Sequence, residues 1–199
     1  MKVGITGGIG SGKSYICKRL EARGIMVYDC DSAAKRLIST NPEIRQQLTE
    51  LIGPEAYETE ENLLADKPHL TYRLNKAVVT HFLLKNAQNA HAIDSIVHPA
   101  VFHDFEISGM QWMESAIMYE SGIYKLVDRV VVVTAPEEIR IQRIINRDNT
   151  TREKALQWME RQWPQQQIKA LADYEIINDG FADIDGQIDL LLSRLSQNV

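Results

Sequence analysis

The stretch Gly7-Gly8-Ile9-Gly10-Ser11-Gly12-Lys13-Ser14 decides the fold of this 199-residue chain. It fits the phosphate-loop pattern GxxxxGK[ST], after an apolar run at 2–6 and before helical spacing at 14–23. The glycines let successive backbone N–H groups face phosphate oxygens, and the following helix start adds about half a positive charge. The pattern therefore predicts a nucleotide site, where Lys13 reaches the β and γ phosphates and the Ser14 hydroxyl binds Mg²⁺.

Strand and helix patterns alternate through much of the chain. Helices are expected to begin at Ser14, Pro136, Thr150 and Ile184, and strands are expected at 2–6, 25–31, 115–119, 129–134 and 175–178. Short apolar strands alternating with helices favour a parallel sheet that is covered on both faces. The expected fold is therefore α/β, a phosphate-loop fold of the nucleoside-kinase type with a five-stranded parallel sheet.

Two helical segments interrupt this sheet pattern. The first, 32–110, has no expected strand, and its breaks are Asn41-Pro42, Gly53-Pro54, Lys67-Pro68 and His98-Pro99. The second, 137–168, is expected to be a helical hairpin that acts as a lid, with Arg140, Arg143 and Arg147 on one helix face. The remaining core then comprises 1–31, 111–136 and 169–199.

Composition limits the possible partners. The chain has 22 Lys and Arg against 27 Asp and Glu, so it offers no basic stripe for a nucleic acid. No apolar run approaches the roughly 20 residues of a membrane helix. Cys17 and Cys30 lack metal-ligand spacing and are expected to be core residues. We expect a cytoplasmic protein whose partners include neither nucleic acid nor membrane; the sequence predicts no oligomeric state.

Other phosphate-loop proteins fit less well than a small-molecule kinase. A regulatory GTPase needs an Asn-Lys-x-Asp motif, and Asn75-Lys76-Ala77-Val78 lacks the Asp. Motor and transport ATPases usually end a strand in a magnesium-holding Asp, whereas Val130 to Val133 is followed by Thr134. A kinase requires a base near the acceptor hydroxyl and arginines around the transferred phosphoryl group.

Two residues are candidates for these roles. Asp31, expected at the carboxyl end of the second strand, is the candidate base, because open parallel sheets bind ligands there. A helix N-cap is its alternative role, and Asp29 faces the same way but deeper. Arg147 is the candidate phosphate clamp, with Arg143 and Arg140 behind it. An ordinary solvated helix face is the alternative for these arginines.

Taken in order, the motifs of this chain resemble those of dephospho-coenzyme A kinases over nearly all its length. The matching segments are Thr6 to Ser14, Asp29-Cys30-Asp31, Ile96-Val97-His98-Pro99, Arg143 to Asp148, Thr151-Arg152-Glu153, Gln162 and Ala172 to Gly180. Each later motif is weak alone, but their order and spacing are specific.

The resemblance implies Mg²⁺-dependent transfer of phosphate from ATP to the ribose 3′-hydroxyl of dephospho-coenzyme A. It implies that 32–110 binds the acceptor and that Asn178 and Gly180 lie by the adenine. The implied catalytic residues are Lys13, Asp31 and Arg147. The implied ATP site comprises Gly8, Ile9, Gly10, Ser11, Gly12, Lys13, Ser14, Tyr15, Arg143, Asn178 and Gly180. The implied acceptor site comprises Asp31, Lys76, His98 and Glu120, although His98 before a proline is also typical of a turn.

The chain departs from the family pattern at the expected acceptor site. Ala116 stands where the family has proline, and Lys76 and Thr80 stand where it has arginines. Arg73 or His81 could compensate. A kinase for another nucleotide or nucleoside-like acceptor therefore stays an alternative, as does an ATP-binding switch without turnover. Asp31 disfavours the switch, because a protein that only binds nucleotide needs no base there.

Overall fold

The computed structural model describes residues 1–62 and 69–197. The chain forms two compact units. The core unit comprises Met1–Asp29 and Gly109–Val199, and the inserted unit comprises Cys30–Ser108. Among the described residues, no helix is both long and apolar enough to cross a membrane.

The core unit contains a parallel sheet with the strand order β2-β5-β1-β6-β7. Its strands are β1 (Val3–Thr6), β2 (Val27–Asp29), β5 (Trp112–Glu114), β6 (Arg129–Thr134) and β7 (Tyr174–Ile177). All four residues of β1 are buried, as are Val130 to Thr134 of β6, which is typical of strands covered on both faces. The central place of β1 puts the phosphate loop at the middle of the carboxyl edge.

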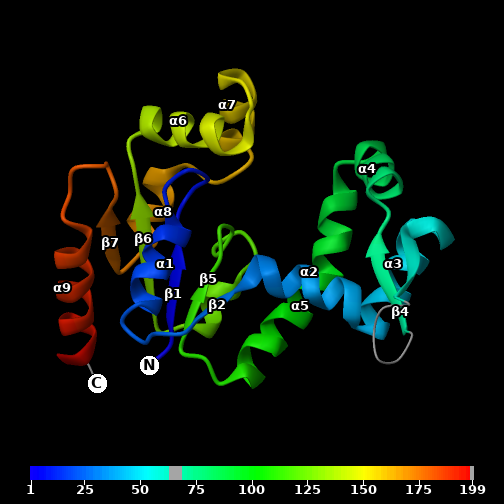
Figure 1. Cartoon of the computed structure of the whole chain (residues 1–199), viewed down its shortest axis with the longest axis horizontal. Helices are drawn as coiled ribbons and strands as arrows, with labels where there is room; N and C mark the ends of the chain where they lie inside the picture. The colour runs from blue at the N-terminus through cyan, green and yellow to red at the C-terminus, as the bar shows by residue number, and fades with distance from the viewer. Residues whose placement is uncertain (63–68, 198–199) are drawn as a thin grey trace. The chain divides into compact units, whose positions relative to one another are not determined.

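Helices surround this sheet. They are α1 (Lys13–Glu21), α6 (Glu137–Asp148), α7 (Arg152–Glu160), α8 (Gln165–Leu171) and α9 (Ile184–Gln197), with a 3₁₀ turn η2 (Ile123–Leu126). Helix α9 lies along the β7 side of the sheet, and α6 and α7 lie beyond the carboxyl ends of the strands (Figure 1). Ile188, Leu191 and Leu195 of α9 are buried in one cluster with Ile16 and Leu20 of α1. The expected amphipathic closing helix is confirmed.

Two expected strands have different ends in the structure. The strand expected at 115–119 is β5, which ends at Glu114; the Ser115 N–H still donates to the Ile5 carbonyl, at 3.0 Å, before the chain turns. The apolar run after it supplies Met118, which is fully buried outside any strand. The strand expected at 25–31 stops at Asp29, so Asp31 lies in a helix.

The inserted unit consists mainly of helices, as expected, but it also contains a hairpin. Its elements are α2 (Cys30–Thr40), α3 (Pro42–Ile52), a 3₁₀ turn η1 (Pro54–Ala56), β3 (Tyr57–Asn62), β4 (His69–Leu74), α4 (Lys76–Lys85) and α5 (Gln88–Ser108). The expectation of no strand at 32–110 is wrong, because β3 and β4 pair antiparallel. Their mutual hydrogen bonds make a strand of a glutamate-rich segment whose own β propensity is low.

The predicted breaks in this unit have mixed outcomes. Asn41 caps α3 before Pro42, and Pro54 begins η1, so both of these breaks are confirmed. The break at His98-Pro99 is wrong, because α5 continues through Pro99. Burial of Val97, Val101 and Phe105 on one side of α5 offsets the hydrogen bond that proline cannot make. Lys67-Pro68 lies outside the described residues.

Candidate active site

The phosphate loop connects β1 to α1 and depends on its glycines. Gly10 and Gly12 have φ angles of +80° and +95°, which an L side chain rarely adopts. A Cβ at Gly10 would lie 2.6 Å from the backbone oxygen of Arg140, and one at Gly12 would collide with the side-chain nitrogen of Asn178. These two glycines therefore allow both the turn and the close approach of neighbouring elements.

Two arginines of α6 hold the outer side of this loop. The Arg140 Nε donates to the Ile9 carbonyl at 3.0 Å, and the Arg143 Nη1 donates to the carbonyls of Gly10 and Ser11 at 3.3 and 3.2 Å. Arg140 is buried, and this burial lowers the pKa of its guanidinium. Because both arginines bind loop carbonyls, the solvated-face alternative is wrong for Arg140 and Arg143.

Asn178 joins the end of β7 to the same loop. Its Nδ2 donates to the Ser11 carbonyl at 2.8 Å, and its Oδ1 accepts from the Arg143 Nη2 at 3.2 Å. Its backbone N–H donates to the Thr134 carbonyl at 2.8 Å. Both ends of the Asn178 amide are therefore used in positioning protein groups around the phosphate loop.

The segment between α7 and α8 also contacts the loop. The Gln162 Oε1 accepts from the Ile9 N–H at 2.7 Å, and its Nε2 donates to the Ala116 carbonyl at 3.4 Å. This one side chain therefore links the far end of the α6–α7 hairpin, the phosphate loop and the segment after β5.

Lys13 lies beside a carboxylate that the sequence analysis missed. Its Nζ is 3.7 Å from the Glu114 Oε1, and these side chains are only 10% and 14% exposed. Glu114 is the last residue of β5 and is paired in register with Ile5 of the central strand. Placing this strand at 115–119 left Glu114 outside it, although a carboxylate after Trp112-Met113 was the available signal.

A pocket of about 450 Å³ adjoins the amino end of α1. It brings together five residues of the predicted ATP site with two apolar residues from the start of α9 and the loop before it. The pocket is lined by Gly12, Tyr15, Arg143, Asn178, Gly180, Ala182 and Ile184. The part of a ligand that extends beyond the phosphate loop on this side would contact this pocket.

Arg147 differs from the other two arginines of α6. Its side chain is 62% exposed, and its Nε and Nη2 donate to the Asp148 carboxylate at 3.0 and 2.7 Å. These hydrogen bonds raise the pKa of Arg147 and lower the pKa of Asp148. The structure therefore keeps a charged, solvent-facing arginine at the end of α6.

The four predicted acceptor residues belong to different elements. Asp31 lies in the first turn of α2, Lys76 begins α4 and His98 lies within α5, all in the inserted unit. His98 is therefore helical, and its alternative role as a turn residue is wrong; its Nε2 lies 3.6 Å from the Asp94 Oδ1. Glu120 lies in the core unit, where its Oε1 accepts from the Trp163 N–H at 3.1 Å.

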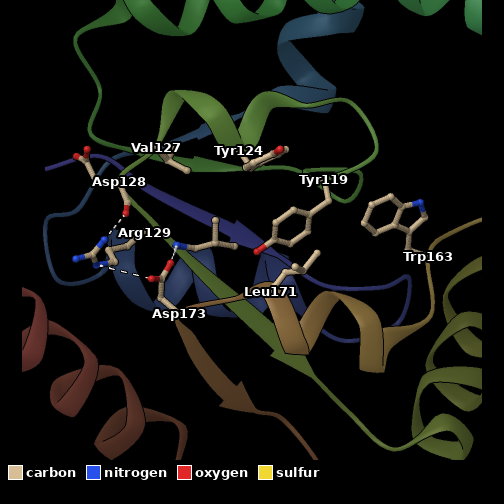
Figure 2. Close-up of a pocket in the computed structure, with 9 residues that line it drawn as sticks. Tyr119, Tyr124, Val127, Asp128, Arg129, Trp163, Leu171 and Asp173 are labelled. Carbon is tan, nitrogen blue, oxygen red and sulfur yellow. Dashed lines mark hydrogen bonds and ion pairs between the residues drawn. The ribbon is translucent and has the colours of Figure 1, made fainter.

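A second pocket, of about 350 Å³, lies in the core unit and shares no residue with the first (Figure 2). Aromatic side chains and the Arg129–Asp173 ion pair line it, including Tyr119, which stacks on Trp163 at a centroid distance of 6.3 Å. The Tyr119 hydroxyl is buried, and burial raises its pKa to about 12, so it stays protonated near neutral pH. None of the predicted site residues lines this pocket.

The protein groups fit a magnesium ion that is shared with phosphates. Mg²⁺ is usually held by one or two protein oxygens together with substrate phosphates and water. Among the described residues, no cluster of three or more His, Cys, Asp or Glu forms a closed metal site. Ser14, in the first turn of α1, and Glu114 provide the kind of oxygen donors that a shared ion needs.

Comparison with known proteins agrees with this geometry. The model of the dephospho-CoA kinase family matches residues 1–183. The chain belongs to the dephospho-CoA kinase family. The dephospho-CoA kinase of Bacteroides fragilis is 35% identical over 210 residues, with 100% of this chain and 95% of that protein covered. This is a family of phosphotransferases, so the chain is an enzyme that transfers a phosphoryl group.

Solved structures show the same phosphate-loop kinase fold. Dephospho-CoA kinase from Campylobacter jejuni matches with a TM-score of 0.63 at 19% identity, covering 100% of this chain and 99% of that chain. A crystal structure from Thermus thermophilus matches with a TM-score of 0.76 at 24% identity, covering 100% and 98%. The family assignment and the predicted fold class are both confirmed.

Proposed function

We propose that this chain transfers the γ-phosphoryl group of ATP to the ribose 3′-hydroxyl of dephospho-coenzyme A, giving coenzyme A and ADP. The observation that carries this proposal is the phosphate loop itself. Arg140, Arg143 and Asn178 bind the carbonyls on its outer side, so groups of the protein itself fix the backbone of the loop. A preorganised cluster of N–H groups costs little reorganisation when charge develops on phosphate oxygens.

Lys13 neutralises negative charge on the β and γ phosphates in this proposal. The Lys13 ammonium group lies 3.7 Å from the carboxylate of Glu114, and both side chains are nearly buried. A triphosphate offers Lys13 more negative charge than one carboxylate does, and low exposure strengthens that attraction. Mg²⁺, held by Ser14 and the phosphates, would supply further neutralisation of charge.

Asp31 and Arg147 complete the proposed chemistry. The Asp31 carboxylate accepts the proton of the ribose hydroxyl while the ribose oxygen forms a bond to the γ phosphorus. ADP leaves with the electrons of the P–O bond that breaks. Arg147 exchanges Asp148 for the transferred phosphoryl group when the lid at 137–168 closes. Its exposed guanidinium is suited to this exchange, because water already surrounds more than half of the side chain.

The inserted unit binds the acceptor in this proposal, with Lys76 and His98 on its α4 and α5 helices. Thr80 lies one turn after Lys76 and cannot provide the charge of the arginine that the family pattern has there. The acceptor site therefore depends on fewer cations than the family pattern provides. The cytoplasmic location also remains a prediction of the sequence; the two buried free cysteines support it.

The proposed reaction is tested by incubating the purified chain with Mg-ATP and separate acceptors, followed by mass detection of products. We expect dephospho-coenzyme A to gain one phosphoryl group at the 3′ position, with equal formation of ADP. Phosphorylation of another nucleotide or nucleoside instead would contradict the acceptor assignment alone. ATP binding with no phosphorylated product from any acceptor would support the switch and contradict the kinase proposal.

A further inference from the structure

An exposed aromatic residue lies between two residues that line the pocket beside the phosphate loop. Phe181 is 94% exposed, the highest exposed fraction of any large apolar side chain among the described residues. Its chain neighbours Gly180 and Ala182 both line that pocket. A ring so fully hydrated adds nothing to the core, and its apolar surface is open to contact with a ligand.

The backbone around Phe181 is fixed even though its ring is exposed. The Asp179 Oδ1 accepts from the N–H groups of Phe181 and Ala182 at 2.9 and 2.8 Å. Gly180, with φ at +90°, makes the turn between Asp179 and Phe181. The loop therefore fixes the Phe181 backbone between two residues of the pocket lining, which leaves only side-chain torsions to be ordered when a ligand binds there.

The pocket itself has few polar groups left for a ligand to bind. The Asn178 amide is already occupied at both ends by Ser11 and Arg143. The Tyr15 hydroxyl accepts from Arg19 at 2.6 Å, and the Arg19 guanidinium lies 5.1 Å from the Tyr15 ring centroid. The surface that remains for contact with a ligand is largely apolar. It comprises the Tyr15 ring and the aliphatic side chains of Ala182 and Ile184.

We propose that Phe181 stacks on the nucleobase of the bound nucleotide and supplies much of the affinity that depends on the base. The proposal rests on the proposed function, since it places the triphosphate at the phosphate loop. A nucleotide with its phosphates there must extend into the adjoining pocket, where a flat base finds apolar surface but few free side-chain hydrogen-bonding groups. Stacking on an aromatic ring is then the strongest available contact, because every base has a π face.

Binding measured without an acceptor tests this role. We expect Phe181→Ala to weaken ATP and ADP binding about tenfold, which corresponds to about 1.4 kcal/mol for one base–aromatic stack. Inorganic tripolyphosphate, which lacks a base, should bind the parent and the variant equally. Leu190→Ala is the matched control, because Leu190 is a 53% exposed apolar residue of α9 that does not line the pocket.

A second variant keeps the test independent of any folding defect. Phe181→Trp should retain ATP affinity within about threefold, and its indole fluorescence should change on adding ATP but not on adding tripolyphosphate. In turnover, Phe181→Ala should raise the KM for ATP about tenfold at an unchanged kcat, because the base contact is the same before and during phosphoryl transfer.

Three results would overturn the proposal. The first is ATP binding by Phe181→Ala within twofold of the parent, and the second is an equal loss of tripolyphosphate binding. The third is a change of oligomeric state in Phe181→Ala by sedimentation with nucleotide affinity unchanged, which would make Phe181 a subunit contact. A base-dependent loss of ATP binding in a chain without kinase activity would support Phe181 stacking while contradicting the proposed function.

Discussion

Lys13 owes its environment to residues distant in sequence. Glu114, which ends a strand 101 positions later, lies 3.7 Å from its ammonium group, and both side chains are nearly buried. In this setting a positive charge interacts strongly with a triphosphate, since little water screens it. The phosphate-loop motif alone identifies Lys13, but the strength of the attraction between its positive charge and a triphosphate depends on this burial.

Lys13→Ala should reduce kcat by about 100-fold or more, because it removes a charge that stabilises the transition state. The folded structure should persist, with an unchanged circular dichroism spectrum. Steady-state assays with saturating Mg-ATP check this, and Lys18→Ala, an exposed lysine of the same helix, is the control. Turnover by Lys13→Ala within a few-fold of the parent would contradict the phosphate-loop role.

Asp31 in the first turn of α2 permits a different test. As a base on the acceptor hydroxyl, it should affect kcat much more than ATP affinity. Asp31→Asn keeps the side-chain shape and removes the charge, and we expect kcat to fall about 10² to 10⁴-fold with ATP binding within about threefold of the parent. Glu43→Gln, at the same position relative to α3, controls for loss of a carboxylate at a helix start.

The pattern of losses identifies the role of Asp31. Normal turnover of Asp31→Asn together with a lower Tm would make Asp31 a structural residue of the first turn of α2. A selective loss of ATP binding would instead place it near the metal and phosphates. Calorimetric binding of ATP and steady-state kinetics on the same samples distinguish these cases.

Helix α6 has two functions along its length. Its first turns hold the phosphate loop through Arg140 and Arg143, whereas Arg147 at its end faces solvent and pairs with Asp148. A helix that is fixed at one end and solvated at the other is suited to a lid whose far end moves. The lid remains a prediction, and Arg147 offers the direct way to test it.

Arg147→Lys should slow phosphoryl transfer while ATP binding stays close to that of the parent. Lysine keeps the charge but cannot make the two parallel hydrogen bonds of a guanidinium to phosphate oxygens. We expect a loss of about tenfold in kcat, measured by single-turnover kinetics. Arg152→Lys on α7, whose guanidinium pairs with the exposed Glu138, should change turnover little. Equal rates for Arg147→Lys and the parent would assign Arg147 to the solvated surface.

The start of α7 corrects one helix prediction. The sequence predicts a helix that begins at Thr150, but α7 begins at Arg152; Thr151 is its N-cap and accepts from the Lys154 N–H at 3.4 Å. The preceding helix explains the shift: Asn149, the C-cap of α6, is in a left-handed conformation with φ at +48°, and the Thr150 N–H still donates to the Ile145 carbonyl of α6.

Thr151→Ala should therefore lower the free energy of unfolding by about 1 kcal/mol, which is typical for the loss of a Thr N-cap. The expected fall in Tm is about 2 to 4 °C for a chain of this size, measured by thermal denaturation. Thr150→Ala should have a smaller effect, since Thr150 does not cap the helix. The opposite order of these two variants would restore Thr150 as the N-cap.

At the scale of the whole molecule, the chain divides its proposed tasks between two compact units. The core unit contains the phosphate loop and the adjoining pocket, and the inserted unit contains Asp31, Lys76 and His98. Acceptor choice should therefore respond to changes in the inserted unit and at Glu120, and nucleotide choice to changes elsewhere in the core unit.

Transfer should favour dephospho-coenzyme A over adenosine by a factor of at least 10 in kcat/KM. A larger acceptor makes remote contacts that orient its 3′-hydroxyl, and this binding energy lowers the barrier to transfer. Because Lys76 keeps one positive charge and Thr80 provides none, the KM for dephospho-coenzyme A should be high and should rise only modestly with salt. Initial rates with each acceptor at two salt concentrations check both expectations. An equal or higher kcat/KM for adenosine would contradict the assignment of dephospho-coenzyme A as the acceptor, but it would leave the assignment as a kinase unchanged.

The sequence by itself determined the fold class and the phosphate-binding element. Gly10, Gly12, Lys13 and Ser14 form a local motif, and the strand and helix beside it are local as well, so their spacing was sufficient. The closing helix followed from the periodicity of Ile188, Leu191 and Leu195. These features rely on interactions between residues close in the chain, which a pattern of residue types records directly.

Only the tertiary structure decided the surroundings of that motif. Glu114 beside Lys13, Gln162 on the Ile9 N–H and Asn178 between Ser11 and Arg143 are contacts across more than thirty residues, and no local spacing specifies them. The hairpin β3–β4 was missed for the same reason, because a glutamate-rich strand forms only when its partner satisfies its backbone groups. A local motif depends on residues that are neighbours in the chain, so its spacing can be recognised in the sequence. Packing contacts join residues that are distant in the chain, so they are known only from the tertiary structure.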